Sequence, residues 1–415
     1  MQISVAKSNS LSYLLSFLIL FSSSFGFAQE IAPEYSFFNP SQADEFDSPE
    51  LIKGEYFSDY NTFQRPLSDP AMRWTLKNHY DLILGSVSGK EFIEKQKIFF
   101  SGHLSKDLEV RFLWFRDHDL EQGFSQATIE LIYWWNHWGL AVNGFPSAAK
   151  SDNDLGFALL NRSFLGGESR IFVHFPDFQR NSRNKENDRW QDSPLVMGFA
   201  SRSSDHELVL RHEKQLSWFL PDEGRLYHFK RTIVQAKKWF KLTEDKSLAL
   251  AFFYENKYEG QDPLPGNTAI TSDSLRRERV STQIEYEQSI HSHQLLVGLA
   301  HHYRDYQKHE SDFRLHNWLP YVWWGRAWQG PETFQRRWKF GIDTAIFDAS
   351  NEPLFLGEDV ARGIHTFRID SRFNTVYEMR SQGRWSLNLL FTFDIDMYKS
   401  DGLWEGGAGQ FRFYF

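Results

Sequence analysis

The chain closes on the stretch GQFRFYF, residues 409–415. Successive side chains of an extended segment point to opposite faces, so Phe411, Phe413 and Phe415 would share one face. The residues between them, Gln410, Arg412 and Tyr414, would share the other. Three aromatic rings opposite polar groups predict an amphipathic β-strand at this end of the chain.

A longer run of the same kind lies just upstream, at residues 384–397. Its odd positions are apolar, and they are Trp385, Leu387, Leu389, Phe391, Phe393, Ile395 and Met397. Strands of soluble proteins seldom exceed about ten residues. Strict alternation over this length predicts a strand with one face toward lipid. Further alternating runs occupy residues 108–114, 126–133, 171–175, 248–254, 279–286, 295–299, 334–346 and 367–380.

The terminal strand and the alternating body together resemble the Gram-negative outer-membrane β-barrel proteins as a class. The resemblance implies that the strand carrying Phe411, Phe413 and Phe415 closes the barrel and is read by the assembly machinery. It also implies an all-β fold, a transmembrane antiparallel up-and-down barrel of about 18 strands, within roughly 16–20. In size the chain is similar to polysaccharide-export and capsule-assembly barrels and to porins.

The first 71 residues are predicted not to form strands of the barrel. Residues 1–28 have the features of a secretory signal peptide, with Lys7, an apolar run at 11–21 and small residues Gly26 and Ala28 before the cleavage site. A membrane anchor is the alternative, although the run is short of the roughly 20 residues that a span needs. Residues 29–71 do not alternate, and they are interpreted as a periplasmic or lumen-associated segment or as a disordered leader. The barrel is expected over residues 72–415.

The composition agrees with an exported barrel. The chain has no cysteine, 17% aromatic residues and a mean hydropathy of −0.52. Without cysteine there can be no disulfide, no thiol catalysis and no cysteine-bound zinc. An aromatic-rich chain that is polar on average fits a lipid-facing outside and a wet inside. The net charge of −8 argues against a nucleic-acid partner.

Sequence motifs for catalysis are missing. There is no Gly-rich phosphate loop, no His-Glu-x-x-His pair and no Gly-x-Ser-x-Gly elbow. His301 and His302 would point to opposite faces of a strand, so they cannot chelate one ion together. The sequence therefore predicts no enzyme, no cofactor and no metal site.

The face opposite the apolar stripe is rich in charge. The lumen-lining candidates are Arg337, Lys339, Arg368, Arg372, Arg384 and Asp394. The same face was expected to hold Arg277, Arg279, Arg304, Arg314, Arg326 and Arg412, with acids such as Glu285, Asp343 and Glu378. One interpretation is a basic lane that guides anions. The other is that these groups pair across strands and line the wall.

Tryptophans supply a second candidate site. By the sequence register, Trp318, Trp324, Trp328 and Trp134 fall on the inward face, where the first three could stack against sugar rings. The alternative is an interfacial girdle, because tryptophan side chains favour the headgroup level of a membrane.

The leading functional hypothesis is an outer-membrane channel that passes polar or anionic solutes or polymer, with exopolysaccharide export as one case. A non-conducting barrel that binds surface polysaccharide is one alternative, and a sheath around a periplasmic electron-transfer partner is another. Expected partners are outer-membrane lipid and lipopolysaccharide, the barrel-assembly machinery through the C-terminal strand, and anionic polysaccharide or periplasmic export proteins.

Overall fold

A computed structural model describes residues 77–87, 91–118, 123–145, 154–175, 195–220, 225–263, 273–308, 311–329, 334–350, 365–381, 384–395 and 404–415. These residues form one sheet of 18 strands in which each strand pairs antiparallel with its neighbours in the chain. The expected signal peptide at 1–28 and the segment at 29–71 lie outside the described residues.

The strands fall into two groups by length. The short-stranded wall is formed by β1 (His79–Val87), β2 (Glu91–His103), β3 (Leu108–His118), β4 (Gly123–Trp135), β5 (Trp138–Phe145), β6 (Asp154–Asn161), β7 (Glu168–Phe175) and β8 (Val196–Arg202). The long-stranded wall is formed by β9 (His206–Leu220), β10 (Arg225–Lys241), β11 (Lys246–Pro263), β12 (Asp273–Ile290), β13 (His293–Lys308), β14 (Ser311–Gln329), β15 (Phe334–Ser350) and β16 (His365–Ser381). The last two strands, β17 (Trp385–Asp394) and β18 (Trp404–Tyr414), complete the sheet.

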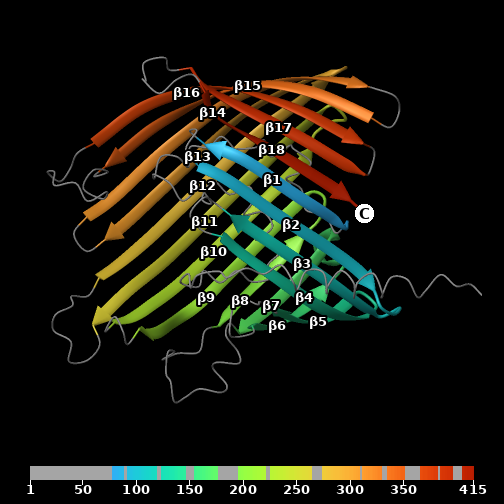
Figure 1. The fold of residues 1–415 in the computed structure, drawn as a ribbon, viewed down its shortest axis with the longest axis vertical. Coiled ribbons are helices and arrows are strands. Elements are labelled where there is room, and N and C mark those ends of the chain that lie inside the picture. The colour runs from blue at the N-terminus through green and yellow to red at the C-terminus, as the bar shows by residue number, and fades with distance from the viewer. Residues whose placement is uncertain are drawn as a thin grey trace, which may run out of the picture.

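The sheet closes on itself through its first and last strands. β18 pairs with β17 on one side and with β1 on the other, from His79 opposite Tyr414 to Val87 opposite Gly406. Closure leaves no unpaired edge, which is what lets a β-structure cross lipid. The prediction of an antiparallel barrel of about 18 strands, closed by the terminal strand, is confirmed (Figure 1).

At one end of the barrel, which we call the short-turn end, every connection between strands contains two to six residues. Two of these turns, at residues 136–137 and 291–292, contain only two residues. Asn136 and His291 adopt left-handed backbone angles there, with φ of 56° and 55°. Such angles suit two-residue hairpins because they match the twist of the flanking strands. β1 begins and β18 ends at the short-turn end; we call the opposite end the loop end.

The two walls differ in height. Strands of the short-stranded wall contain 7 to 13 residues, whereas those of the long-stranded wall contain 15 to 19. In Figure 1 the long strands run past the short ones at the loop end. At about 3.4 Å per residue, the longest strands are much longer than a tilted membrane strand of about 9–11 residues needs.

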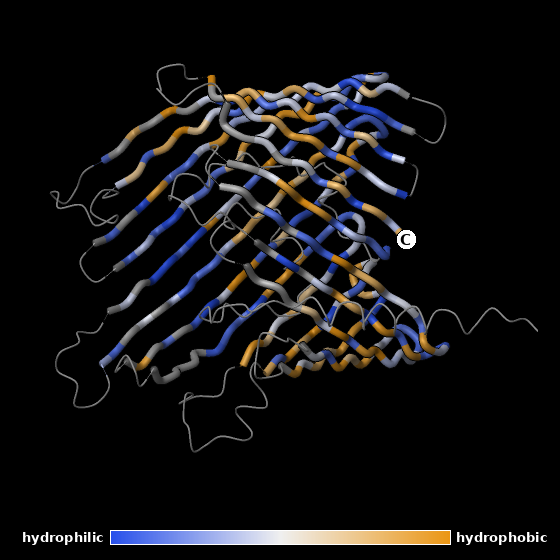
Figure 2. Tube along the Cα trace, in the orientation of Figure 1, coloured by the Kyte–Doolittle hydropathy of each residue, from blue (hydrophilic) through white to orange (hydrophobic). Residues whose placement is uncertain are grey.

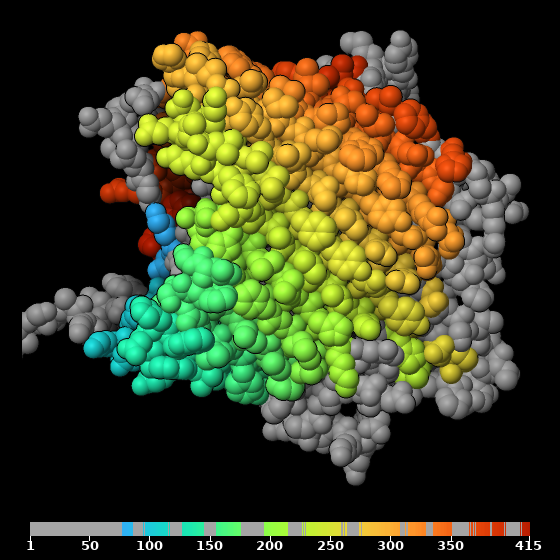
Figure 3. Space-filling model, turned by 180° about the vertical axis from the view of Figure 1, so that it is seen from behind, coloured from blue at the N-terminus to red at the C-terminus, as the bar shows by residue number. Residues whose placement is uncertain are grey.

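The outer surface carries apolar side chains, as the alternation predicted. Exposed examples on the short-stranded wall are Leu131, Tyr133, Leu140, Phe157, Leu159 and Ile171. Figure 2 shows apolar and polar residues alternating along the strands, and Figure 3 shows the packed outer wall from behind, hollowed at the short-turn end. On the long-stranded wall the apolar positions, such as Phe252 and Ile284, give way toward the loop end to exposed Lys230, Arg276 and Arg314. The described residues include no helix that is both long and apolar enough to span a membrane.

Candidate functional site

The inner wall of the barrel holds most of the buried charged side chains. Arg111, Glu130 and Arg170 of the short-stranded wall are at most 3% exposed. Glu255, Arg304 and Lys339 of the long-stranded wall are at most 7% exposed. Since lipid-facing neighbours alternate with them along each strand, these groups point into the barrel. Any transport or binding chemistry must therefore come from this inner wall.

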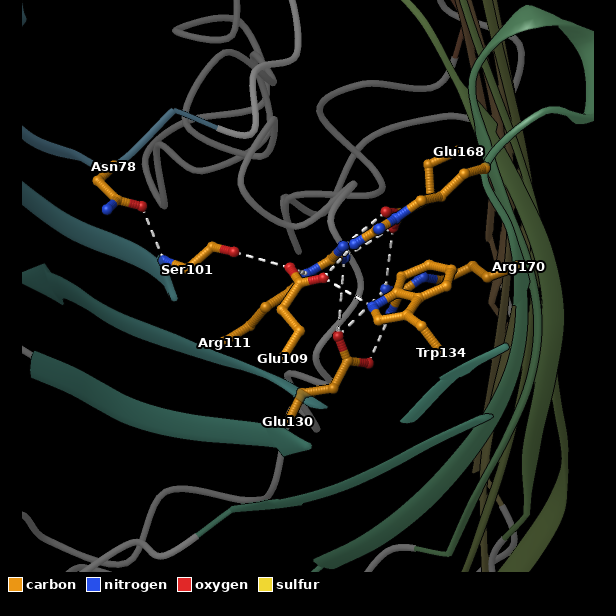
Figure 4. A network of polar contacts seen from close by, with 9 residues as sticks. Asn78, Ser101, Glu109, Arg111, Glu130, Trp134, Glu168 and Arg170 are labelled. Atoms are coloured by element: carbon orange, nitrogen blue, oxygen red, sulfur yellow. Dashed lines mark hydrogen bonds and ion pairs between the residues drawn. The ribbon is translucent and has the colours of Figure 1, made fainter. Parts of the chain in front are cut away.

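A network of paired charges crosses the inside of the short-stranded wall (Figure 4). Arg111 on β3 donates two parallel hydrogen bonds to the Glu168 carboxylate on β7, at 2.7 and 2.6 Å. Arg170 on β7 donates to both Glu130 carboxylate oxygens, at 3.0 and 3.2 Å, and to Glu168 at 3.3 Å. Bidentate pairs of this type are the strong charge-assisted hydrogen bonds. Because each arginine and glutamate of the network has an ionised partner, these side chains can stay charged while buried.

Glu109 on β3 extends the network toward the barrel seam. It accepts hydrogen bonds from Arg111 Nε at 2.7 Å, from the indole Nε1 of Trp134 at 2.8 Å and from the hydroxyl of Ser101 at 2.7 Å. Arg162, whose guanidinium lies 3.5 Å from the Trp134 ring centroid, also pairs with Glu109. The Ser101 amide donates to Asn78 Oδ1 at 2.7 Å, which links the network to the start of β1.

Signs of this network were present in the sequence as Glu109-x-Arg111 and Glu168-x-Arg170, two acid–base pairs on alternate positions of predicted strands. The sequence could not pair them, because Arg111 and Glu168 are 57 residues apart. Their meeting depends on how the sheet curves between β3 and β7.

The inner wall also contains apolar clusters, which the expectation of a wet interior did not foresee. The cluster inside the short-stranded wall is formed by Phe99, Leu113, Ile132, Trp134, Ala141, Ala158, Leu160, Phe172 and Val196. A second cluster on β13–β15 is formed by Ala300, Tyr306, Leu315, Leu319, Ala345, Phe347 and Ala349. Ile132 and Leu160 are fully buried. In these two clusters the inner wall is covered by packed apolar side chains.

Four inward aromatic rings lie over glycines directly opposite them on the next strand. The pairs are Trp134 with Gly139, Phe172 with Gly198, Tyr321 with Gly298, and Trp323 with Gly341. A Cβ atom added at Gly341 would come within 2.4 Å of the Trp323 ring, and one at Gly298 within 2.0 Å of the Tyr321 ring. The glycines therefore let these rings lie flat against the wall.

Three of the predicted lumen-lining residues have described side chains on the inner wall. Arg337 on β15 donates to Gln294 Oε1 at 2.7 Å. Lys339 lies 2.7 Å from the Glu378 carboxylate on β16. Arg372 is buried directly opposite Asp343 in the register. In this part of the wall, basic side chains lie close to acids.

The other lumen-lining candidates are less fully described. Arg368 lies opposite Phe347 in β16, and Asp394 lies opposite Arg372 at the end of β17; their side chains lie outside the described residues. Arg384 is an exposed residue of the turn before β17, and its carbonyl accepts a hydrogen bond from the Tyr414 amide at 2.7 Å. It therefore sits at the short-turn end of the barrel.

The closing strand carries one of the tightest pairs of the inner wall. Arg412 on β18 donates to both carboxylate oxygens of Asp81 on β1, at 2.5 and 2.6 Å. Both side chains are buried. On the outer face of the same strand lie Phe411, Phe413 and Phe415, with Phe413 stacked beside Phe415 at 6.3 Å. The sequence thus specifies both faces of the seam.

The assignment of Trp318, Trp324 and Trp328 to the inward face is wrong. Each is 42–44% exposed and shares the outer face of β14, where Trp318 stacks on His301 at 3.9 Å and Trp324 on Phe340 at 6.2 Å. The inward positions of β14 are themselves largely apolar, so alternation gave no signal there. Trp134 does point inward, as expected.

Two arginines of the same region also face outward. Arg314 and Arg326 are exposed, on the same face of β14 as the three tryptophans. They lie near the two ends of the strand, where charged groups can reach water or headgroups. Among the described residues, no three His, Asp or Glu side chains come together as a metal site would require.

Comparison with known proteins gives structural likeness alone. No known family matches the sequence, and no curated protein is similar to it. Similar solved structures include Acinetobacter baumannii OccAB3, with 9% identity over 82% of this chain and 98% of that chain and a TM-score of 0.39. A bacterial polysaccharide outer-membrane secretin shares 8% identity over 82% and 100%, with a TM-score of 0.39. Pseudomonas aeruginosa OpdK, solved with vanillate, shares 11% identity over 81% and 97%, also with a TM-score of 0.39.

The closed sheet, its apolar outer face and its charged inner face define the architecture of an outer-membrane β-barrel protein.

Proposed function

We propose that this protein is an outer-membrane channel that passes polar or anionic solutes or polymer, with exopolysaccharide as one candidate cargo. The observation that carries the proposal is the charged inner face of the long-stranded wall. The inward basic side chains described there are Arg211, Arg231, Lys237, Lys257, Arg277, Arg279, Arg304, Arg337, Lys339, Arg372 and Arg380, and the inward acids Glu207, Glu213, Glu255, Glu285, Glu287, Asp343 and Glu378 are fewer. An excess of fixed positive charge favours anions in a confined aqueous path.

The orientation follows from the unequal ends. In bacterial barrels short turns face the periplasm and longer loops face outward. The short-turn end would then face the periplasm, and the taller part of the long-stranded wall would stand outside the bilayer. A signal peptide at residues 1–28 would deliver the chain to this location.

A non-conducting barrel that binds surface polysaccharide is the second candidate. The buried apolar cluster inside the short-stranded wall favours it, because side chains such as Ile132 and Leu160 are shielded from solvent on the inner face. A lumen packed on that side has less room for solutes.

Two measurements test the candidates, and the second separates them. The protein should first fractionate with the outer membrane and migrate faster on gels when it is not heated, and recovery as a soluble periplasmic protein would refute both candidates. Purified protein in planar bilayers should then give discrete single-channel steps. A folded barrel that shows no conductance, yet is retained on an acidic-polysaccharide column, would overturn the channel and support the binder.

A further inference from the structure

The outer face of the long-stranded wall carries a row of four rings, which we call the ring platform: His301 and Tyr303 on β13, and His316 and Trp318 on β14. The centroid of the His301 ring lies 3.9 Å from that of Trp318 and 5.6 Å from that of His316. Tyr303 continues the row, 4.8 Å from His316. Strand register sets this order, because His301 is directly opposite Trp318 and Tyr303 is directly opposite His316.

The platform is open to the outside and is partly polar. Trp318 is 44% exposed, and His316 is exposed as well. The Nε2 atom of His301 lies 3.3 Å from the Nδ1 atom of His316, so one imidazole donates a hydrogen bond to the other, and the two ring planes are within 20° of each other. An interfacial girdle needs only amphipathic rings at the membrane surface. The paired imidazoles add hydrogen-bonding atoms beside the flat ring faces.

Position along β14 places the platform at one surface of the membrane. Between Trp318 and Gln329, which ends β14 at the short-turn end, the strand is as long as a tilted membrane strand of about 9–11 residues. The inference rests on the orientation given under the proposed function, in which the loop end faces outward. Trp318 then lies at the level of the headgroups of the outer leaflet, and His316 and Arg314 lie beyond it.

Charged groups flank the platform on its outward side. The Arg314 side chain is 57% exposed, and its Nε atom lies 3.7 Å from a carboxylate oxygen of Asp305, which is longer than a hydrogen bond. Asp348 on β15 is exposed and directly opposite His316. At about 3.4 Å per residue, Trp318 and Arg314 are about 14 Å apart along the strand. A single phosphate is too small to contact both, whereas a phosphorylated disaccharide spans them.

We propose that the ring platform and Arg314 bind the phosphorylated disaccharide headgroup of a glycolipid in the outer leaflet. A sugar packs its C–H face on Trp318, because the face of an aromatic ring carries partial negative charge. Sugar hydroxyls meet the His316 imidazole and the Asp348 carboxylate. The phosphate pairs with Arg314, since a guanidinium group contacts phosphate at two points. The sequence predicted lipopolysaccharide as a partner without a site, and these residues supply one.

The other end of the same strand offers a matched control. Trp324 and Arg326 share the outer face of β14 with Trp318 and are exposed, but they lie toward the short-turn end. Trp324 is 42% exposed, close to the value for Trp318. Only about 7 Å of strand separates Trp324 from Arg326, a spacing that suits a phospholipid headgroup better than a disaccharide.

The test is native mass spectrometry of the protein purified from outer membranes in detergent, titrated with three lipids. Lipid A carries a phosphorylated disaccharide, glucosyl diacylglycerol carries a sugar without phosphate, and phosphatidylglycerol carries a phosphate without a sugar ring. Lipid A should bind about tenfold more tightly than either of the others, because it alone makes both kinds of contact. Equal dissociation constants for the three lipids would overturn the site.

Matched variants place the binding on the platform. Trp318→Leu keeps an apolar side chain but removes the ring, and Arg314→Gln removes the phosphate partner; each should weaken lipid A binding by about tenfold. Trp324→Leu and Arg326→Gln make the same changes toward the short-turn end and should leave lipid A binding unchanged. No loss in the first pair, or an equal loss in the second, would overturn the assignment. If Trp318→Leu does not fold, the comparison of Arg314→Gln with Arg326→Gln decides alone.

Orientation and conductance are tested separately. The chain has no cysteine, so a single introduced cysteine reports which end of the barrel faces out. Gln307→Cys, toward the loop end, should react with a membrane-impermeant maleimide on intact cells, whereas Ser105→Cys, in the turn between β2 and β3, should not. The reverse pattern would overturn both the orientation and the site. A barrel that conducts nothing yet prefers lipid A refutes the channel alone, and a conducting barrel without that preference refutes the site alone.

Discussion

The two walls of this barrel solve the problem of buried charge in different ways. Inside the short-stranded wall, three cations, Arg111, Arg162 and Arg170, pair with three carboxylates, those of Glu109, Glu130 and Glu168. Inside the long-stranded wall, the buried Glu255 pairs with both Arg231 and Arg279, and Arg279 lies directly opposite Arg304. The first arrangement matches carboxylates and guanidinium groups in number, whereas the second shares one buried carboxylate between two arginines.

The outer faces differ in the same sense. The short-stranded wall is apolar along its exposed face, whereas the long-stranded wall becomes polar and charged toward the loop end. Around the barrel, the length of the strands and the polarity of their outer face therefore change together. The short-stranded wall therefore fits the apolar interior of a membrane along its height, whereas the long-stranded wall also has a polar outer part toward the loop end.

The largest expected effect is on the paired network. Glu168→Gln leaves Arg111 and Arg170 without their shared carboxylate and should cost about 3–5 kcal/mol in the free energy of unfolding, because an uncompensated buried charge remains. Urea unfolding of the barrel in lipid vesicles would measure it. Because the groups are buried, added salt should recover little of the loss.

The matched change in the other wall is Glu255→Gln. It should also destabilise, but salt should restore much of the loss, since the partly exposed Arg231 and Arg277 are open to counterions. The Debye length falls from about 10 Å at 0.1 M to about 3 Å at 1 M salt. The same salt response in both variants would remove the distinction between the walls.

A second pair of changes concerns the outer faces. Phe157→Arg, at mid-strand in β6, should cost about 2–4 kcal/mol if the position lies near the bilayer midplane. Asn256→Arg, on the outer face of β11 toward the loop end, should cost about 0–1 kcal/mol, as expected near or beyond the interface. Unfolding of both variants in lipid vesicles would measure the two changes in unfolding free energy. Equal changes would show that the long strands do not rise above the membrane.

The register of the last strands can be tested in the same assay. Leu389 on β17 faces outward and Asn388 faces the interior, where it lies opposite Glu378. Leu389→Arg should cost about 2–4 kcal/mol. Asn388→Arg should cost less, because its guanidinium can meet the Glu378 carboxylate. Indistinguishable losses would contradict the register.

A smaller effect is expected where an aromatic ring lies over glycine. Gly341→Val would push the Trp323 ring off the wall and should cost about 1–3 kcal/mol through overpacking. In an open channel it should also lower the single-channel conductance, because the ring would swing into the lumen. Gly409→Ala is the control, because its added Cβ would meet Leu389 at an ordinary 3.4 Å. Unaltered stability and conductance in Gly341→Val would show that the ring has room to move.

Much of this architecture could be predicted from the sequence where one face of a strand is purely apolar. Residues 384–397 and 409–415 specified their lipid-facing sides, and both faces lie as expected in β17 and β18. β14 could not be read in this way, because Leu315, Leu319, Tyr321 and Trp323 make its inner face apolar too. When both faces of a strand are apolar, the alternation of side chains does not indicate which face points into the barrel.

The candidate site was less predictable than the fold. Arg337, Lys339 and Arg372 were placed correctly on the inner wall, since charged residues alternate with lipid-facing ones. Their partners were not, because a contact such as Arg412 with Asp81 spans 331 residues. Only strand order and shear bring such groups together, and neither is encoded in a local pattern.

The central claim, that an open lumen takes its selectivity from the long-stranded wall, is tested most directly by the reversal potential of single channels under a salt gradient. Wild type should be anion-selective, and Arg337→Ser with Arg372→Ser should move the potential toward cation selectivity. The shift should shrink at high salt, where fixed charges are screened. A cation-selective wild type, or a reversal potential indifferent to both arginines at low salt, would contradict the account.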